Sequence, residues 1–198
     1  MIRILTDSAA DLTAAELNAP GVTVVPMTVT FMDGSSQEDD GTMTKDDYFA
    51  RLASDSKLPR TSQPSPSAYI QAYEDAAAAG DEVIVITIAQ KLSGTFQSAR
   101  LAAADADFAP YIVDSESATQ GEALIVREAL RLRDEEHLSA KEIFNALEQF
   151  KKRVRIVAIV DSLKHLQKGG RLPAAVAIVG GALGIKPVLA LKDGEIKL

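Results

Sequence analysis

The sequence predicts an α/β fold: a doubly wound, mostly parallel sheet domain, followed by an incomplete second α/β domain with an antiparallel hairpin. Two observations predict this class. Short runs rich in Val and Ile alternate with helix-length segments, which is the pattern of a parallel sheet covered by helices on both faces. Small polar motifs directly follow several of these runs, at the strand ends where open α/β sheets bind their ligands.

Five segments are predicted as strands because they are short, apolar and rich in β-branched residues. The run at 82–88 is nearly continuous in Val and Ile, which indicates a strand buried on both faces, and 155–160 is interpreted in the same way. The segment 22–31 alternates, and Asp33-Gly34 marks the turn that ends it. The predicted strands are residues 2–6, 22–31, 82–88, 109–113 and 155–160.

Helices are expected where a capping residue precedes a helix-length run. Ser65 followed by Pro66 is the strongest start, because serine caps well and proline suits the first helical position. Ser139 with Glu142 forms a capping box. Further starts are expected at Ser8 with Asp11, at Thr44 with Asp47, around Gly94, and at Ser117 with Gln120.

The regular alternation of strand-length and helix-length segments ends near residue 160. We therefore predict an N-terminal α/β domain at 1–160 and the beginning of a second domain at 161–198. In the second part a short helix at 163–167 ends at Lys168-Gly169-Gly170-Arg171. Asp193-Gly194 then turns one strand back on another. Such a final hairpin leaves an unpaired edge, so we expect a partial domain that self-association can cover.

Composition excludes several classes of function. The net charge is −7, which leaves no basic field for nucleic acid. The chain has no cysteine, and its two histidines, His137 and His165, lack metal-binding spacing, so no metal site is expected. No apolar stretch is long enough to span a bilayer and no signal-peptide pattern is present, so a cytoplasmic protein is expected.

The motif Ser93-Gly94-Thr95 lies where a strand hands over to a helix. Its hydroxyls and amides can cradle an anion, or they can simply cap the helix. Thr61 and Ser62 lie in a predicted loop and stay free, because Ser65 already caps the next helix. Neither motif is a P-loop or a nucleophile elbow, so no catalytic residue is assigned and no cofactor is expected.

Other polar residues have two interpretations each. Asp7, Asp114 and Asp161 follow strands and either form loop hydrogen bonds, which is the commoner role, or take part in catalysis. His165 lies in a local basic cluster with Lys168 and Arg171, which is either a solvated loop or a docking point for a phosphate or an acidic partner. The Ala/Gly-rich run at 174–184 either packs helices tightly or leaves room for an apolar chain.

Several motifs, in this order along the whole chain, resemble the DegV family, the fatty-acid-binding proteins that serve bacterial fatty acid kinases. They are TDSAADL at 6–12, TSQPSP at 61–66, LSGTFQSA at 92–99, Asp114-Ser115 with Gly121, KGGR at 168–171 and IKP at 185–187. The chain departs from the family at Ala123, where a second glycine is common, and at Leu198, beyond which the family's second domain continues with a histidine of the carboxylate network.

The resemblance implies a fatty acid bound between two domains, with its carboxylate held by hydroxyls matching Thr61 and Ser93. Ser62, Gly94 and Thr95 belong to the same expected site, while Arg171 and Lys168 are expected to contact a partner kinase. That kinase phosphorylates the bound carboxylate to an acyl-phosphate, so the chain is expected to be a carrier and not an enzyme. The alternative is a small-molecule phosphotransferase or hydrolase that uses the same rim of strand ends.

Overall fold

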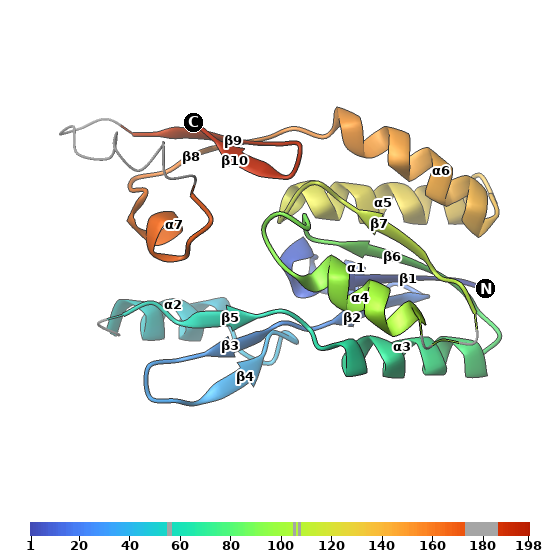
Figure 1. Cartoon of the computed structure of the whole chain (residues 1–198), viewed down its shortest axis with the longest axis horizontal. Helices are drawn as coiled ribbons and strands as arrows, with labels where there is room; N and C mark the ends of the chain where they lie inside the picture. The colour runs from blue at the N-terminus through green and yellow to red at the C-terminus, as the bar shows by residue number, and fades with distance from the viewer. Residues whose placement is uncertain (55–56, 105, 107, 173–185) are drawn as a thin grey trace.

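The computed structural model describes residues 1–54, 57–104, 106, 108–172 and 186–198. Its centre is a four-stranded parallel sheet in the order β2-β1-β6-β7. These strands are β1 (Ile2–Asp7), β2 (Val22–Val25), β6 (Glu82–Thr87) and β7 (Tyr111–Asp114). The sheet and its covering helices confirm the predicted α/β class (Figure 1).

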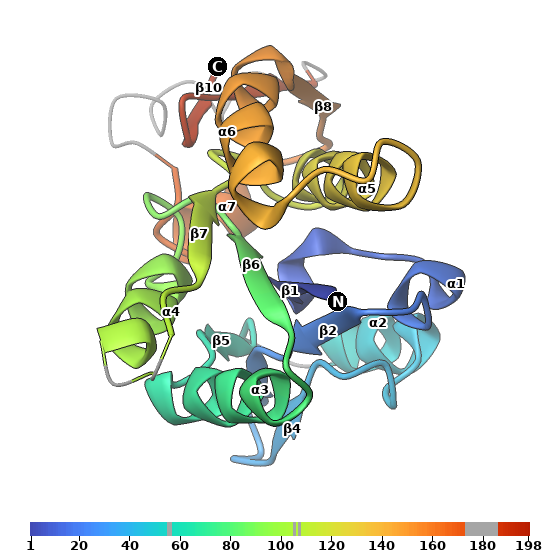
Figure 2. The ribbon, with the colours of Figure 1, turned by 90° about the vertical axis from the view of Figure 1, so that its right-hand side faces the viewer.

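Helices cover both faces of this sheet (Figure 2). One face packs against α3 (Pro66–Ala78) and α4 (Thr95–Ala104), where Val85 lies in one apolar cluster with Tyr73 and Ala99. The other face packs against α5 (Gln120–Asp134) and α6 (Ala140–Phe150), where Ile84 clusters with Ile125. Successive strand residues point to opposite faces, so a continuous apolar run is what a sheet covered on both sides requires.

Local capping chemistry sets most helix starts as expected. Ser65 Oγ accepts from the amide of Ala68 at 3.2 Å, with Pro66 in the first helical position. The Ser139 capping box begins α6, and Thr44 Oγ1 accepts from the amide of Asp47 at 3.0 Å at the start of α2 (Lys45–Ser54). A further helix, α1 (Ala14–Leu17), was not predicted, although a capping box of Thr13 and Glu16 begins it.

Two predicted caps are wrong. Ser8 lies inside a 3₁₀ helix, η1 (Ser8–Ala10), that Asp7 caps, and the Ser8 hydroxyl accepts instead from the amide of Met27 at 3.1 Å. Helix α5 begins after Thr119, whose backbone has φ 50°, and not after Ser117. The Ser117 amide donates to Ser115 Oγ at 3.0 Å, so this segment is a tight turn of its own.

The predicted single strand at 22–31 is two strands in different sheets. It is broken at Pro26, which has no amide hydrogen to continue a ladder. β2 ends at Val25, and β3 (Thr28–Thr30) joins an antiparallel sheet in the order β4-β3-β5 with β4 (Ser36–Glu38) and β5 (Arg60–Ser62). The Asp33-Gly34 turn connects β3 to β4 as expected, with Gly34 at φ 84°.

The strand predicted at 155–160 was wrongly assigned to the buried parallel core. After the 3₁₀ helix η2 (Lys151–Arg153), β8 (Ile156–Ile159) pairs antiparallel with β9 (Val188–Lys192), which pairs with β10 (Glu195–Lys197). Val157 is 66% exposed and Ile159 is 69% exposed, so the apolar pattern does not report burial here. The Asp193-Gly194 hairpin is confirmed.

Helix α7 (Lys164–Lys168) lies between the β8-β9-β10 sheet and the β3-β4-β5 sheet in Figure 1. The Ala/Gly-rich run at 174–184 falls outside the described residues. Within the described ranges no helix is both long and apolar enough to cross a bilayer. The division into domains near residue 160, and self-association of the second part, stay predictions.

Candidate functional site

The polar motifs meet at a cavity of about 720 Å³ beside the carboxyl end of β6, which we call the hydroxyl-lined cavity. Thr61, Ser62, Ser93 and Gly94, all predicted site residues, line it. Segments about thirty residues apart in sequence are therefore side by side at this wall. Its apolar lining comes from Met27, Ile88, Leu92, Leu166 and Ile196.

The loop from β6 to α4 supplies one half of the hydroxyl-lined cavity. Ser93 Oγ and Thr95 Oγ1 are 2.9 Å apart, so the two hydroxyls share a hydrogen bond. Thr95 is fully buried and supports Ser93 from behind without lining the cavity. A Cβ on Gly94 would lie 2.2 Å from Oε1 of Gln63, so the glycine is needed for this close approach.

Strand β5 supplies the other half. Thr61 and Ser62 were expected in a loop, but they pair with Val29 and Thr28 of β3 in an antiparallel ladder. A three-residue edge strand with polar side chains carries too little pattern to be recognised from sequence. The Gln63 amide that follows donates to Ser98 Oγ at 3.1 Å, which ties β5 to α4. Gln63 also lines the cavity and was missed.

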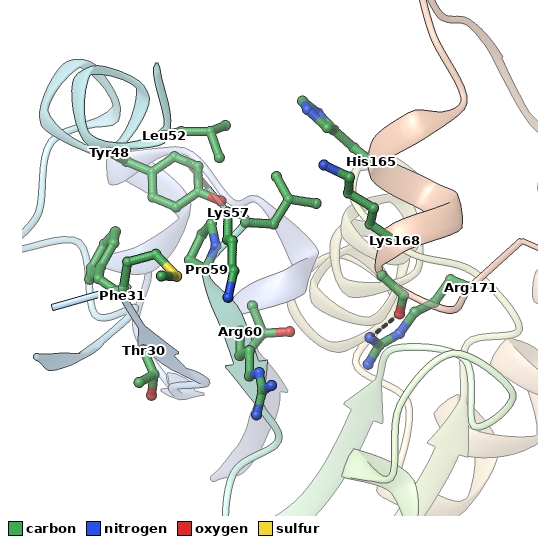
Figure 3. Close-up of a pocket in the computed structure, with 14 residues that line it drawn as sticks. Thr30, Phe31, Tyr48, Leu52, Lys57, Pro59, Arg60, His165, Lys168 and Arg171 are labelled. Carbon is green, nitrogen blue, oxygen red and sulfur yellow. Dashed lines mark hydrogen bonds between the residues drawn. The ribbon is translucent and has the colours of Figure 1, made fainter. Parts of the chain in front are cut away.

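The segment after α7 closes the cavity with positive charge. Arg171 donates from Nε to the carbonyl of Leu92 at 3.3 Å and from Nη1 to the carbonyl of Gly169 at 2.6 Å. His165 lines the same wall, whereas Lys168 lines only the neighbouring cavity shown in Figure 3. The structure thus brings the basic cluster next to Ser93. The sequence did not indicate this proximity, because the two segments are about eighty residues apart.

Two buried carboxylates hold the loops beneath the site. Asp7 accepts from the amide of Ala9 through Oδ1 and from the amide of Ile88 through Oδ2, both at 2.9 Å. Asp114 Oδ1 accepts from the amides of Gln90 at 3.2 Å and Glu116 at 3.0 Å. These are the loop hydrogen bonds predicted as the commoner role for these residues. The bonds to Ile88 and Gln90 each join the end of one strand to the loop after its neighbour, and the bonds to Ala9 and Glu116 are local.

Asp161, the third aspartate singled out, lies elsewhere. Its side chain is 86% exposed and pairs with Lys186 Nζ at 2.8 Å. It lines neither the hydroxyl-lined cavity nor the neighbouring cavity. In the part of the chain that the structure describes, no group of three or more His, Asp or Glu side chains could hold a metal ion.

Glu122 carries a buried carboxyl group that the sequence did not indicate. Its side chain is fully buried at the start of α5, where Oε1 accepts from Thr6 Oγ1 at 3.1 Å and Oε2 has no partner among the described residues. Burial, followed by the charges of Asp7 and Asp114, raises the pKa of Glu122 well above its usual value. In sequence it is indistinguishable from an ordinary acidic residue in a first helical turn.

As pH falls from 7 to 4, we expect the wild type to gain stability relative to the Asp7→Asn variant. Burial raises the pKa of Asp7 from 3.8 to about 6, although the two amide donors oppose the shift. The folded state therefore binds a proton more tightly than the unfolded state. Protonation of Asp7 therefore stabilises the folded state by about 3 kcal/mol below about pH 4. This stabilisation is lost as pH rises through 6. Urea unfolding from pH 4 to 7 measures it, and parallel profiles for the two proteins would show that Asp7 ionises normally.

Comparison with known proteins identifies the family. The model described as "Uncharacterised protein, DegV family" matches residues 1–198. A DegV domain-containing protein of Caldanaerobacter subterraneus is 36% identical over 198 residues, which are 100% of this chain and 70% of the relative. One from Deinococcus radiodurans is 37% identical over 195 residues, or 98% of this chain and 69% of the relative.

Solved structures agree. A Thermus thermophilus DegV family protein, described as binding fatty acid, superposes with a TM-score of 0.88 at 36% identity, covering 99% of this chain and 69% of that one. A stearic-acid-binding protein of Eubacterium ventriosum superposes with a TM-score of 0.91 at 33% identity, covering 100% and 69%. These matches extend over the parallel sheet, the hydroxyl motifs and the basic cluster alike. The chain belongs to the DegV family.

Proposed function

We propose that this chain binds a long-chain fatty acid and presents its carboxylate to a partner kinase. The observation that carries the proposal is the lining of the hydroxyl-lined cavity. Thr61, Ser62 and Ser93 offer neutral donors, and Arg171 lies next to Ser93, where it donates to the carbonyl of Leu92; apolar side chains line the same cavity. A carboxylate attached to an aliphatic chain satisfies both kinds of surface at once. Two solved relatives, described as fatty-acid-binding and stearic-acid-binding, support the same ligand class.

The two parts of the ligand have different energetic roles. Burial of an aliphatic chain contributes about 0.8 kcal/mol per CH₂, so the tail supplies most of the affinity. Each hydrogen bond to the charged head group contributes about 1.5–3 kcal/mol and sets its position. Hydroxyl donors hold the carboxylate without a tight ion pair, which leaves an oxygen free to attack phosphorus. A new O–P bond then forms as the bond to the kinase's phosphoryl donor breaks.

On this proposal the chain is a carrier that works in the cytoplasm, and the chemistry belongs to the kinase. The carboxylates nearest the site already accept hydrogen bonds from backbone amides, as Asp7 does from Ile88 and Asp114 from Gln90. Their lone pairs are therefore committed to holding loops. This arrangement favours the carrier over a phosphotransferase or hydrolase that uses the same rim.

Native mass spectrometry of the protein purified from bacteria tests the proposal. A co-purified mass equal to that of a long-chain fatty acid, lost from a Ser93→Ala/Thr61→Ala variant, supports the carrier. A bound nucleotide or a covalent phosphoryl adduct on the wild-type chain would instead support the enzyme.

Arg171 is expected to matter more for phosphoryl transfer than for lipid binding. Its side chain is solvent-exposed at the cavity mouth, so its charge should add only about 0.2–1 kcal/mol to holding a carboxylate. We expect Arg171→Gln to weaken fatty acid binding by no more than about fivefold. Acyl-phosphate formation with a fatty acid kinase should fall by at least about tenfold, because arginines stabilise transferring phosphoryl groups. Equal losses in both assays would place Arg171 among the carboxylate ligands.

A further inference from the structure

A second cavity, of about 920 Å³, adjoins the hydroxyl-lined cavity, and we call it the cationic cavity. The two cavities share Thr61, His165, Gly169 and Arg171 in their walls. Figure 3 shows Lys57 and Arg60 on one side of the cationic cavity, and His165, Lys168 and Arg171 on the side that carries α7. Basic side chains from segments more than a hundred residues apart therefore face one space.

The charge of this cavity is opposite to that of the whole chain. The net charge of the protein is −7, yet among the described residues that line the cationic cavity there is no Asp or Glu. Lys57, Arg60 and Lys168 form no ion pair with any described acidic residue within 4.0 Å, and neither does Arg171. Cations that face one another without counter-charges repel, so a bound anion stabilises this arrangement.

The neighbouring arginine shows how a structural cation behaves in the same region. Arg51 pairs with Asp33 at 2.8 Å, and its guanidinium lies 3.6 Å from the centre of the Phe31 ring. Its charge is therefore balanced within the fold. The four cavity cations have no such partner among the described residues, and they line one cavity together (Figure 3).

The lining also indicates the class of anion. The planar guanidinium of arginine can donate two hydrogen bonds to two oxygens of one phosphate, and the ammonium groups of lysines attract the same anion. Four formal positive charges suit an anion with more than one negative charge. Apolar and aromatic side chains, among them Phe31, Tyr48 and Leu52, make up much of the remaining lining. We propose that the cationic cavity binds a phosphate-type dianion, and specifically the phosphoryl group of an acyl-phosphate whose acyl end lies at the hydroxyl-lined cavity.

The identity of the acyl-phosphate rests on the proposed function. Phosphorylation converts the head group from a monoanion to a dianion and extends it by one phosphoryl group. The shared wall at Thr61 and Arg171 places the cationic cavity next to the carboxylate position. The carrier then binds its product more tightly than its substrate and shields a reactive anhydride from water.

Binding of three probes to the full chain tests the proposal: hexadecanoate, hexadecyl phosphate as a stable analogue of acyl-phosphate, and inorganic pyrophosphate. The test variant is Lys57→Gln/Arg60→Gln, and both residues are exposed, so folding should be preserved. The matched control is Lys152→Gln/Arg153→Gln, which removes the same charge from exposed positions that line neither cavity.

We expect the wild type to bind hexadecyl phosphate at least about tenfold more tightly than hexadecanoate. The test variant should lose this preference and keep its affinity for hexadecanoate within about threefold, while the control variant changes neither. No preference in the wild type, or equal losses in both variants, overturns the phosphate site and leaves fatty acid binding untouched. If neither alkyl ligand binds but pyrophosphate binding depends on Lys57 and Arg60, the dianion site stands and its assignment to an acyl-phosphate fails with the proposed function.

Discussion

Replacing Ser93 by alanine is expected to weaken fatty acid binding by about ten- to a hundredfold, and replacing Thr61 should have an effect of the same size. Each change removes one hydrogen bond to a charged head group, and such a bond contributes about 1.5–3 kcal/mol. Both hydroxyls line the hydroxyl-lined cavity. Titration of each variant with a long-chain fatty acid measures the loss.

The two variants should differ in stability. Ser93 shares a hydrogen bond with the buried hydroxyl of Thr95, so its removal should lower the free energy of unfolding by about 0.5–1.5 kcal/mol. Thr61 pairs with Val29 across β3 and β5, so its removal should cost a few tenths of a kcal/mol. Ser67→Ala, an exposed hydroxyl on α3 outside the cavity, is the matched control and should change neither property. Unchanged affinity in both site variants would place the carboxylate elsewhere.

Gly121→Ala is expected to destabilise the fold by about 1–3 kcal/mol through overpacking. A Cβ at this position would lie 2.0 Å from Ser117 Oγ and 2.7 Å from Ile156 Cγ1. The glycine therefore lets the start of α5 approach both the Ser115–Ser117 turn and strand β8. Alanine's better helix propensity offsets part of the loss but not the collision. Urea unfolding of the variant measures the change.

A second substitution separates collision from other causes. Ser117→Ala removes the nearer of the two obstructing side-chain groups, so the double variant Gly121→Ala/Ser117→Ala should recover part of the lost stability. If the two changes are strictly additive, the contact between these side chains is not the source of the destabilisation.

Local signals predicted the parts of the fold that depend on neighbouring residues. The Ser65-Pro66 start and the Ser139 capping box need only three or four consecutive residues to form, and both are present. The buried Val/Ile run of β6 is equally local in origin, because only a strand covered on both faces tolerates it. The hydroxyl motif at Ser93 lies at the strand end where parallel sheets bind ligands.

Pairing between distant segments was not predictable in this way. Nothing in 155–160 shows that it pairs with 188–192 in place of the parallel sheet. Arg60 and Lys57 are unremarkable in sequence, because what distinguishes them is the cavity that they share with His165, Lys168 and Arg171. Glu122 is buried by the approach of α5 to β1, where Thr6 meets it. In each case the missing information is a tertiary contact.

The contact between Gln63 and Gly94 has a consequence for the kinetics of ligand capture. Gln63 lies against the glycine and reaches Ser98, so contacts within the protein join β5 to the β6–α4 loop and to α4. The spacing of the Thr61 and Ser93 hydroxyls is thereby set before a carboxylate arrives. If the chain binds a fatty acid as proposed, little binding free energy is then spent on ordering these two segments, and we expect association to be faster than for a site that must first assemble.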